Sequence, residues 1–189
     1  MLPLAHTQDD CDLVARVLAG EAEAFRVLVE RYQLGVLRIA RSLGPRGGGH
    51  EDLAQDVFVA AFVALRGFDP SKGAFSSWLY TIARNRSLNA RKRKVLLVAG
   101  EPDDAAAPRS GEHEVFSREL RRVLDCALDE LPEEQRTAFV LEELVGLGSE
   151  EIAAIEGVSS GTIRSRLSRA KARLREALAT WEGGVRDER

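Results

Sequence analysis

Apolar residues recur at steps of three and four through nearly the whole chain. Residues 21–44 show this most clearly, because the same face holds Phe25, Leu28, Val29, Tyr32, Val36, Ile39 and Leu43. This spacing matches one face of an α-helix. No segment alternates with period two for long enough to favour a strand. The sequence therefore predicts an all-α fold, with further helices over 9–20, 50–68, 75–94, 115–131, 132–147, 149–157 and 159–181.

The composition changes sharply in the middle of the chain. Residues 96–114 are rich in alanine, proline, glycine and acids, and they show no apolar periodicity. Such a composition is typical of a flexible linker. We therefore expect two small helical domains, residues 10–95 and 115–180, joined by this linker.

Several functional classes are not favoured by the sequence. The cysteines, Cys11 and Cys126, form no CxxC motif, and the three histidines are scattered. We therefore expect no metal site, no cofactor and a reducing compartment. There is no phosphate-binding glycine loop and no triad spacing, so we expect no catalytic residues and no enzyme. No apolar run approaches the roughly 18 residues of a membrane span, so we expect no membrane insertion and a cytoplasmic protein.

Residues 149–174 have the layout of a helix-turn-helix. Gly157 separates a short apolar helix from a longer one, and Ser149 and either Ser159 or Ser160 are expected to cap the two helices. At 100° per residue, the longer helix has one apolar stripe that must face the core. The stripe consists of Ile163, Leu167, Ala170, Leu174 and Leu178.

The opposite face of this helix is small and cationic. Gly161, Ser165 and Ser168 lie centrally, flanked by Thr162, Arg164 and Arg169. Small residues let a helix approach base edges in the major groove, while basic side chains further round contact phosphates. A solvated cationic helix is the alternative. Glu176 is the only acid from 160 to 178, which leaves little charge pairing, and we therefore favour DNA binding.

Residues 75–94 combine aromatic and cationic side chains. Phe75, Trp78 and Tyr80 precede a run of six cations without an acid, which are Arg84, Arg86, Arg91, Lys92, Arg93 and Lys94. Trp78, Asn85 and Asn89 share one helical face. Rings that stack on bases beside cations that follow phosphates are typical of binding to unpaired nucleic acid. The alternative is that Trp78 belongs to the core and that the basic end is solvated.

Residues 50–66 carry acids at one end and apolar residues on nearly all sides, as expected of a central buried helix. Asp52, Gln55, Asp56, Val59 and Val63 form one stripe. Acids in a first turn can simply complement the helix dipole, which accounts for Asp52 better than for Asp56. The residues alone leave open whether this stripe is a protein-docking face.

Three motifs in this order resemble one protein family. The segments "DLAQDVF", "WLYTIARN" and "GTIRSRLSRAKARL" are similar to bacterial RNA polymerase sigma factors of the extracytoplasmic-function (ECF) type, within the sigma-70 family. The resemblance covers roughly residues 10–95 and 115–180. It implies a factor that binds core RNA polymerase, through the β′ clamp and the β subunit, and directs promoter-specific initiation of transcription.

The resemblance also implies roles for individual residues. Asp52, Gln55 and Asp56 would dock on the polymerase clamp. The −10 element would lie near Phe75, Ser76, Ser77, Trp78, Asn85, Arg86 and Asn89. The −35 element would meet Thr162, Arg164, Ser165, Arg166 and Arg169. The implied partners are core polymerase, promoter DNA and an anti-sigma factor.

Other classes of protein share parts of this pattern. A helix-turn-helix regulator that is not a polymerase subunit would share the second domain. A response regulator would need strands and an acidic pocket ahead of it, and residues 1–95 show no strand pattern. A helical adaptor is disfavoured by the two basic clusters.

Overall fold

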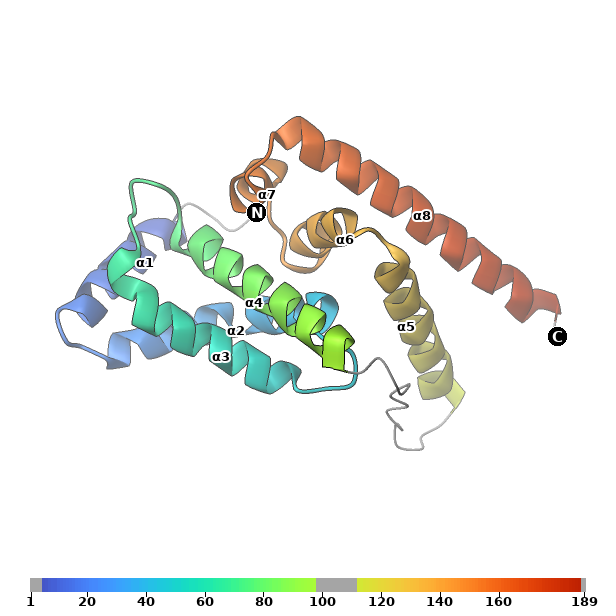
Figure 1. The fold of residues 1–189 in the computed structure, drawn as a ribbon, viewed down its shortest axis with the longest axis horizontal. Coiled ribbons are helices and arrows are strands. Elements are labelled where there is room, and N and C mark those ends of the chain that lie inside the picture. The colour runs from blue at the N-terminus through green and yellow to red at the C-terminus, as the bar shows by residue number, and fades with distance from the viewer. Residues whose placement is uncertain (1–4, 98–111, 188–189) are drawn as a thin grey trace.

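The computed structural model describes residues 5–97 and 112–187, and within these ranges all regular structure is helical (Figure 1). The predicted all-α fold is therefore confirmed. The N-terminal group of helices comprises α1 (Ala5–Leu18), α2 (Glu23–Leu43), α3 (His50–Ala64), the 3₁₀ turn η1 (Leu65–Gly67) and α4 (Phe75–Leu97). The C-terminal group comprises α5 (Glu112–Glu130), α6 (Glu133–Phe139), the π-helical segment η2 (Val140–Leu144), α7 (Ser149–Glu156) and α8 (Ser160–Asp187).

The N-terminal group is a bundle in which α2 packs against α1, α3 and α4. The predicted stripe of α2 provides the centre, since Leu28, Val36, Ile39 and Leu43 have no exposed surface. Val57 of α3 and Leu79 of α4 are buried against the same core. The periodicity in the sequence thus identifies the faces that hold the bundle together.

Helices α2 and α4 approach closely at Gly35. A Cβ atom at this position would lie 2.5 Å from the Tyr80 hydroxyl oxygen and 3.0 Å from its ring. Because glycine has no Cβ, the tyrosine ring can lie directly against the α2 backbone. Tyr80 is 3% exposed, and burial raises its pKa to about 12.

A buried polar network attaches α1 to α2. Asp10 is only 2% exposed and accepts hydrogen bonds from the Tyr32 hydroxyl and from Arg31, which also contacts Asp9. Burial and the neighbouring Asp10 carboxylate raise the pKa of Tyr32 well above its usual range. The buried Asp10 carboxylate and Tyr32 hydroxyl thus both have hydrogen-bond partners, as buried polar groups require.

The helix-turn-helix lies in the C-terminal group as predicted. Gly157 ends α7 with φ +67°, and the Ser159 hydroxyl accepts a hydrogen bond from the Thr162 amide at 3.2 Å to cap α8. Ile163, Leu167, Ala170 and Leu174 of the predicted stripe are buried. The expected cap at Ser149 is wrong. Gly148 occupies the cap position of α7, and its amide donates to the Glu151 carboxylate at 2.8 Å.

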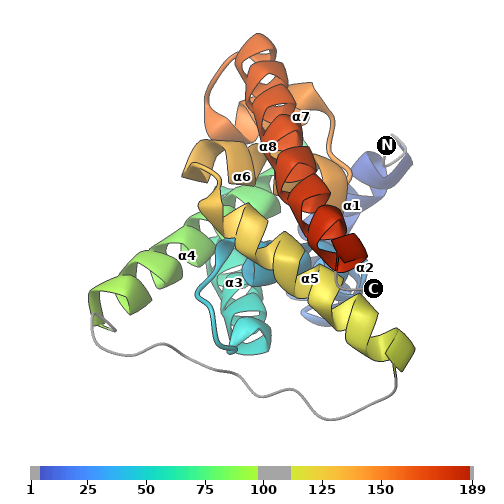
Figure 2. The same ribbon diagram turned by 90° about the vertical axis from the view of Figure 1, so that its right-hand side faces the viewer.

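The two helical groups pack against one another. Figures 1 and 2 show the α6–α7 region over the bundle, and contacts join α4 to α7 and α2 to η2. The buried residues of the bundle form one continuous cluster with Val140, Leu141 and Ile155 of the C-terminal group. Of the predicted linker 96–114, residues 96–97 end α4 and 112–114 begin α5, while 98–111 lie outside the described residues.

Candidate nucleic-acid and protein interfaces

Helix α3 is not the central buried helix expected from its composition. Val59, Phe62 and Val63 are 56%, 46% and 77% exposed, and only the face with Ala54, Val57 and Ala61 is buried in the bundle. The helix is apolar all round because a second apolar face is left at the surface. An exposed apolar patch of this kind marks an interaction surface.

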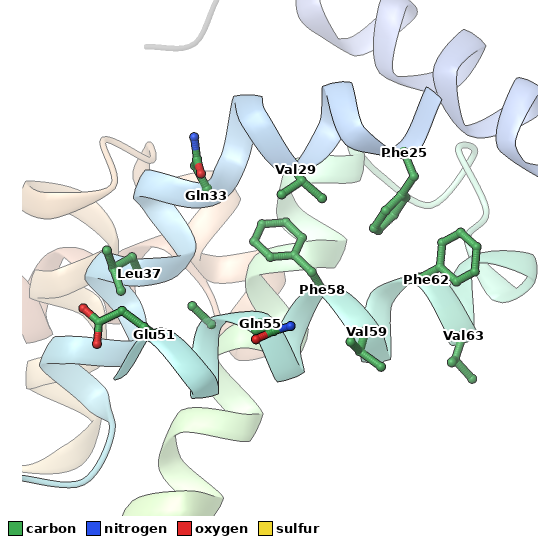
Figure 3. A pocket seen from close by; sticks show the side chains of 11 residues that line it. Phe25, Val29, Gln33, Leu37, Glu51, Gln55, Phe58, Val59, Phe62 and Val63 are labelled. Carbon is green, nitrogen blue, oxygen red and sulfur yellow. The ribbon is translucent and has the colours of Figure 1, made fainter. Parts of the chain in front are cut away.

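This second face forms one wall of a groove. The groove has a volume of about 550 Å³ and lies between α2 and α3 (Figure 3). Phe25, Val29 and Leu37 of α2 form the other wall, opposite Phe58 and Phe62 of α3. The rings of Phe25 and Phe62 meet edge to face, with centroids 5.1 Å apart. The groove, hereafter the α2–α3 groove, suits the apolar stripe of a helix.

Of the three predicted docking residues, Gln55 lines this groove and Asp52 and Asp56 do not. Asp52, Gln55 and Asp56 are all exposed, and Gln55 lines the groove directly with its neighbour Glu51 (Figure 3). Arg41 donates to the Glu51 carboxylate at 2.6 Å, and this hydrogen bond lowers the pKa of Glu51. Glu51 is thus the acid among the residues that line the apolar groove, and Arg41 already pairs with it. The sequence did not predict the α2 wall of the groove, because the helical spacing of Phe25 and Val29 indicates only that they face the core.

The residues predicted for the −10 element fall into two sets on α4. Phe75 and Ser76 are 1% and 7% exposed, and Phe75 packs in an aromatic cluster with Tyr32, Phe68 and Trp78. Phe75 and Ser76 therefore lie in the core beneath the exposed face of α4 and cannot themselves face a ligand. Asn85, Arg86 and Asn89 are exposed, while Ser77 and Trp78 are half-buried.

Ser77 and Trp78 line a small cavity of about 190 Å³. The loop before α4 contributes Phe68, Asp69, Lys72 and Gly73, and the other wall consists of Ala154 and Ile155 from α7. An aromatic side chain, a hydroxyl and a nearby cation therefore border one hollow, and the C-terminal group closes its far side.

The cations of α4 are paired with acids of the C-terminal group, which the sequence did not predict. Arg84 forms an ion pair with Glu156, Arg91 lies 2.8 Å from Asp129, and Lys92 lies 3.3 Å from Glu133. The acids are 38 or more residues away along the chain, as Arg91 and Asp129 show. Local charge patterning therefore gave no sign of these pairs.

The carboxylate of Asp129 in α5 forms ion pairs with three arginines. These are Arg46, Arg91 and Arg136, the last at 3.3 Å. Burial opposes ionisation of Asp129, but hydrogen bonds from Arg91 and Arg46 outweigh it and lower the pKa of Asp129. Arg46 precedes α3 and Arg91 belongs to α4, so this carboxylate joins the two helical groups.

The residues predicted for the −35 element lie at the start of α8. Arg164, Ser165 and Arg169 are exposed, and the Arg169 guanidinium donates to the Ser165 hydroxyl at 2.6 Å. Thr162 is half-buried beside Ser159. The arrangement presents two arginines and small residues on one accessible face, as major-groove readout requires.

The expectation of little charge pairing on this helix is wrong for two cations. Arg166 lies 3.2 Å from Glu156 of α7, and Lys171 lies 2.8 Å and 2.7 Å from Glu142 and Glu143 of η2. The acids come from other helices, so counting acids within the segment missed them. Arg164 and Arg169 keep their exposed positions beside these pairs.

Residues 5–97 and 112–187 contain no group of three histidine, cysteine or acidic side chains arranged to hold a metal ion. Cys11 and Cys126 are free thiols. None of the helices in these ranges combines the length and the apolar character that crossing a membrane demands.

Both helical groups match models of one protein family. Residues 28–95 match the model for sigma-70 region 2, and residues 121–174 match that for sigma-70 region 4. The chain is 37% identical to the ECF RNA polymerase sigma-E factor of Escherichia coli K12, over 84% of this chain and 88% of that protein. It is 34% identical to the factor of the same name from Haemophilus influenzae, over 89% and 94%.

Two solved structures share the fold over both helical groups. CnrH in complex with the cytosolic domain of CnrY has a TM-score of 0.70 and 31% identity, over 89% of this chain and 96% of that one. The sigma factor RpoE in complex with the anti-sigma factor NepR from Bartonella quintana has a TM-score of 0.65 and 29% identity, over 82% and 96%. With region 2 in the N-terminal group, region 4 in the C-terminal group and ECF relatives along most of its length, the chain belongs to the ECF sigma factors of the sigma-70 family.

Proposed function

We propose that this sigma factor docks on core RNA polymerase through the α2–α3 groove, contacts the −10 element with α4 and contacts the −35 element with the start of α8. The observation that carries the proposal is the groove itself. It combines exposed apolar residues with the polar side chains of Glu51 and Gln55 on a bundle that already has a complete core. Residues 10–95 and 115–180 would then be the two functional domains, with 96–114 between them.

The docking surface fits a helical partner with an apolar stripe and flanking cations. Val59, Phe62 and Val63 would lose water on binding, while Asp52, Gln55 and Asp56 would meet the basic flanks of the β′ clamp. Burial of apolar surface contributes roughly 25 cal/mol per Å², so the apolar groove supplies most of the affinity. The carboxylates supply orientation and speed of association. Further contacts to the β subunit would come from the C-terminal group.

The proposed −10 contact uses the surface around Trp78. An extruded base needs an aromatic face and polar groups in a small hollow, and Trp78, Ser77 and the loop before α4 border such a hollow. Asn85 and Asn89 can donate and accept hydrogen bonds at a base edge. Arg86 is exposed on the same helix and would contact the phosphate backbone.

The proposed −35 contact is major-groove readout by α8. Arg164 and Arg169 are suited to bidentate contacts with guanine, and the hydrogen bond from Arg169 to Ser165 fixes the direction of one guanidinium in advance. Arg166 would contact the DNA backbone after exchanging Glu156 for a phosphate. Linking two modest DNA contacts through one polymerase complex raises the overall affinity without adding contacts.

Two further properties are inferred from the relatives. The structures of CnrH with CnrY and of RpoE with NepR are complexes of relatives with partner proteins, the second named an anti-sigma factor. We infer that an anti-sigma protein also binds this chain, across the polymerase-docking surface. The factor would act in the cytoplasm by binding alone, with no catalytic step of its own. A regulator independent of polymerase is not favoured, because region 2 has no role in such a protein.

Reconstitution tests the proposal directly. Purified full-length protein is mixed with bacterial core polymerase and a promoter library, and run-off transcripts are sequenced. We expect transcripts that start downstream of a shared pair of motifs and that are absent with core polymerase alone. Binding to core polymerase without any enriched motif would overturn the proposed DNA contacts, and lack of binding would overturn the docking site.

A further inference from the structure

Ion pairs hold α8 at both edges of its buried stripe. Through that stripe α8 packs against α5, α6 and α7 (Figures 1 and 2). At one edge, Arg166 lies 3.2 Å from Glu156 of α7. At the other, the Lys171 ammonium lies 2.8 Å from Glu142 and 2.7 Å from Glu143 of η2. At about 100° per residue the two cations are about 140° apart around the axis, with the stripe between them. Rotation of α8 in either direction therefore stretches one of these contacts.

The two acids of η2 directly follow buried residues. Val140 and Leu141 have no exposed surface and belong to the core, which fixes the backbone that carries the acids. The side chains of Glu142, Glu143 and Lys171 are only partly exposed, so salt screens their contact incompletely. Hydrogen bonds to the two carboxylates raise the pKa of Lys171, and the bond from Lys171 lowers the pKa of Glu143. Lys171 and Glu143 therefore both keep their charges at neutral pH.

The local charge argues against a phosphate contact for Lys171. One ammonium between two carboxylates leaves one negative charge in excess at this edge of α8. A DNA phosphate that approached there would be repelled by both carboxylates. Arg166 differs, because its acid Glu156 is shared with Arg84 and the cations outnumber the carboxylate. Lys171 is therefore the cation of the two that keeps its acids when α8 meets DNA.

The rotation of α8 decides where the proposed base contacts point. The Arg169 guanidinium donates to the Ser165 carbonyl oxygen at 3.3 Å and to the Ser165 hydroxyl at 2.6 Å, so it turns with the helix. Arg164 lies on the same edge as Lys171, about two turns earlier and about 20° away around the axis. Binding groups must be held to within about 10–20° of their productive direction. A contact that limits rotation of α8 therefore protects base discrimination.

We propose that Lys171 is a positioning residue for −35 recognition. Its ammonium, held by the two acids of η2, fixes the rotation of α8 so that Arg164 and Arg169 face the base edges. Lys171 itself makes no contact with DNA. Burial of the apolar stripe is not directional and decides only which side of α8 faces inward, whereas charge-assisted hydrogen bonds set the angle more finely. The inference rests on the proposed −35 contact and adds a residue that acts through it.

Four variants separate positioning from phosphate contact. Lys171→Met keeps the long apolar stem without the charge, and Lys171→Arg keeps a cation that can bridge both acids. Lys171→Glu places three acids together, and a second change, Glu143→Lys, restores an ion pair in reversed order. A phosphate contact could not be restored in this way, because position 171 would still lack a cation. Arg166→Met is the matched control, since the proposed function assigns Arg166 to the DNA backbone.

The measurement uses holoenzyme formed from the full-length chain and core polymerase. The probe is a library of −35 variants within one promoter that the wild type transcribes. Binding gives the affinity for each sequence, and titration from about 50 to 200 mM salt gives the slope of log affinity against log salt concentration.

For Lys171→Met we expect discrimination between the best and the average −35 sequence to fall about three- to tenfold, with an unchanged salt slope. Lys171→Arg should retain the discrimination of the wild type. Lys171→Glu should lose more than Lys171→Met and should regain most of the loss when Glu143→Lys is added. Arg166→Met should weaken all sequences alike and make the slope shallower by about 0.9.

Three results would exclude the positioning role. They are uniform weakening with a shallower salt slope in Lys171→Met, native discrimination in both Lys171→Met and Lys171→Glu, or no recovery when Glu143→Lys is added. Circular dichroism checks folding, and Lys171→Met carries the test if Lys171→Glu does not fold. A wild-type holoenzyme that prefers no −35 sequence would instead overturn the proposed function, which keeps the two failures distinct.

Discussion

The hydroxyl of Tyr32 donates to the carboxylate of Asp10 inside the N-terminal bundle, and this contact ties α1 to α2. Arg31 completes the network from the solvent side, where its side chain is 20% exposed. The network stabilises the bundle on which the α2–α3 groove is built.

Tyr32→Phe should lower the free energy of unfolding by about 1–2 kcal/mol, because the buried Asp10 loses a donor and keeps only Arg31. Urea denaturation followed by circular dichroism measures the change. Arg26→Gln breaks an exposed pair with Glu30 on the same helix and serves as the control, with an expected change below about 1 kcal/mol. Equal losses in the two variants would show that the buried hydrogen bond contributes nothing special.

The raised pKa of the buried Tyr80 phenol predicts that the folded chain loses stability in alkali. Burial raises its pKa to about 12 in the folded chain, against about 10 in the unfolded chain. The neutral phenol therefore stabilises the fold fully below pH 10, and this contribution falls as the pH rises towards 12. Between pH 8 and pH 11 the wild type should lose about 1.4 kcal/mol more than Tyr80→Phe. Parallel losses in urea titrations at the two pH values would contradict a buried phenol.

The groove can be tested by placing a charge in it. Val59→Asp should weaken core polymerase binding by at least about tenfold, because the carboxylate must lose water on docking. Val59 is 56% exposed, so the free energy of unfolding should change by less than about 0.5 kcal/mol. Leu34→Asp, equally exposed on α2 but outside the groove, is the control. Asp56→Arg should also impair binding without unfolding the protein. Native polymerase binding by Val59→Asp would exclude the groove as the docking site.

Substitutions of the arginines at the start of α8 should distinguish contacts with bases from contacts with phosphates. Arg164→Ala and Arg169→Ala should each reduce discrimination at particular −35 positions by about 1–3 kcal/mol. Arg166→Ala should instead weaken all sequences alike, because its expected partner is a phosphate. Holoenzyme binding to a library of −35 variants measures both effects. A uniform loss for Arg164→Ala would reassign that side chain to the backbone.

The turn of the helix-turn-helix depends on Gly157. Its φ of +67° is strained for any residue with a Cβ, so Gly157→Ala should cost about 1–2 kcal/mol of stability. Gly67→Ala, at a glycine without positive φ and with open space around it, is the control. Thermal unfolding compares the two, and similar melting temperatures for both variants would contradict backbone strain at Gly157.

Local pattern predicted the elements of this fold well. The stripes of α2 and α8 follow from periodicity, and Gly157 follows from the need for a residue that tolerates positive φ. Ser149 was mistaken for a cap because Gly148 can fill that position when Glu151 supplies the carboxylate. The usual rule expects the capping side chain at the cap position itself. In α7 the capping carboxylate instead belongs to Glu151, three residues after Gly148.

Long-range features were not predictable from pattern. The exposed valines of α3 looked like core because hydrophobicity does not say which apolar face meets the bundle and which meets a partner. The cations of α4 looked unpaired because Asp129 and Glu156 lie far along the chain. Only the packing of the two groups brings these charges together.

Gly35 has a consequence for the geometry of initiation. Because Tyr80 lies against the α2 backbone there, the helix that carries the proposed polymerase groove and the helix with the proposed −10 contact cannot come closer unless the tyrosine ring moves. In the proposed function, this contact helps to set the distance between the polymerase-docking surface and the −10 contact. A larger side chain at Gly35 would displace Tyr80 and alter that distance.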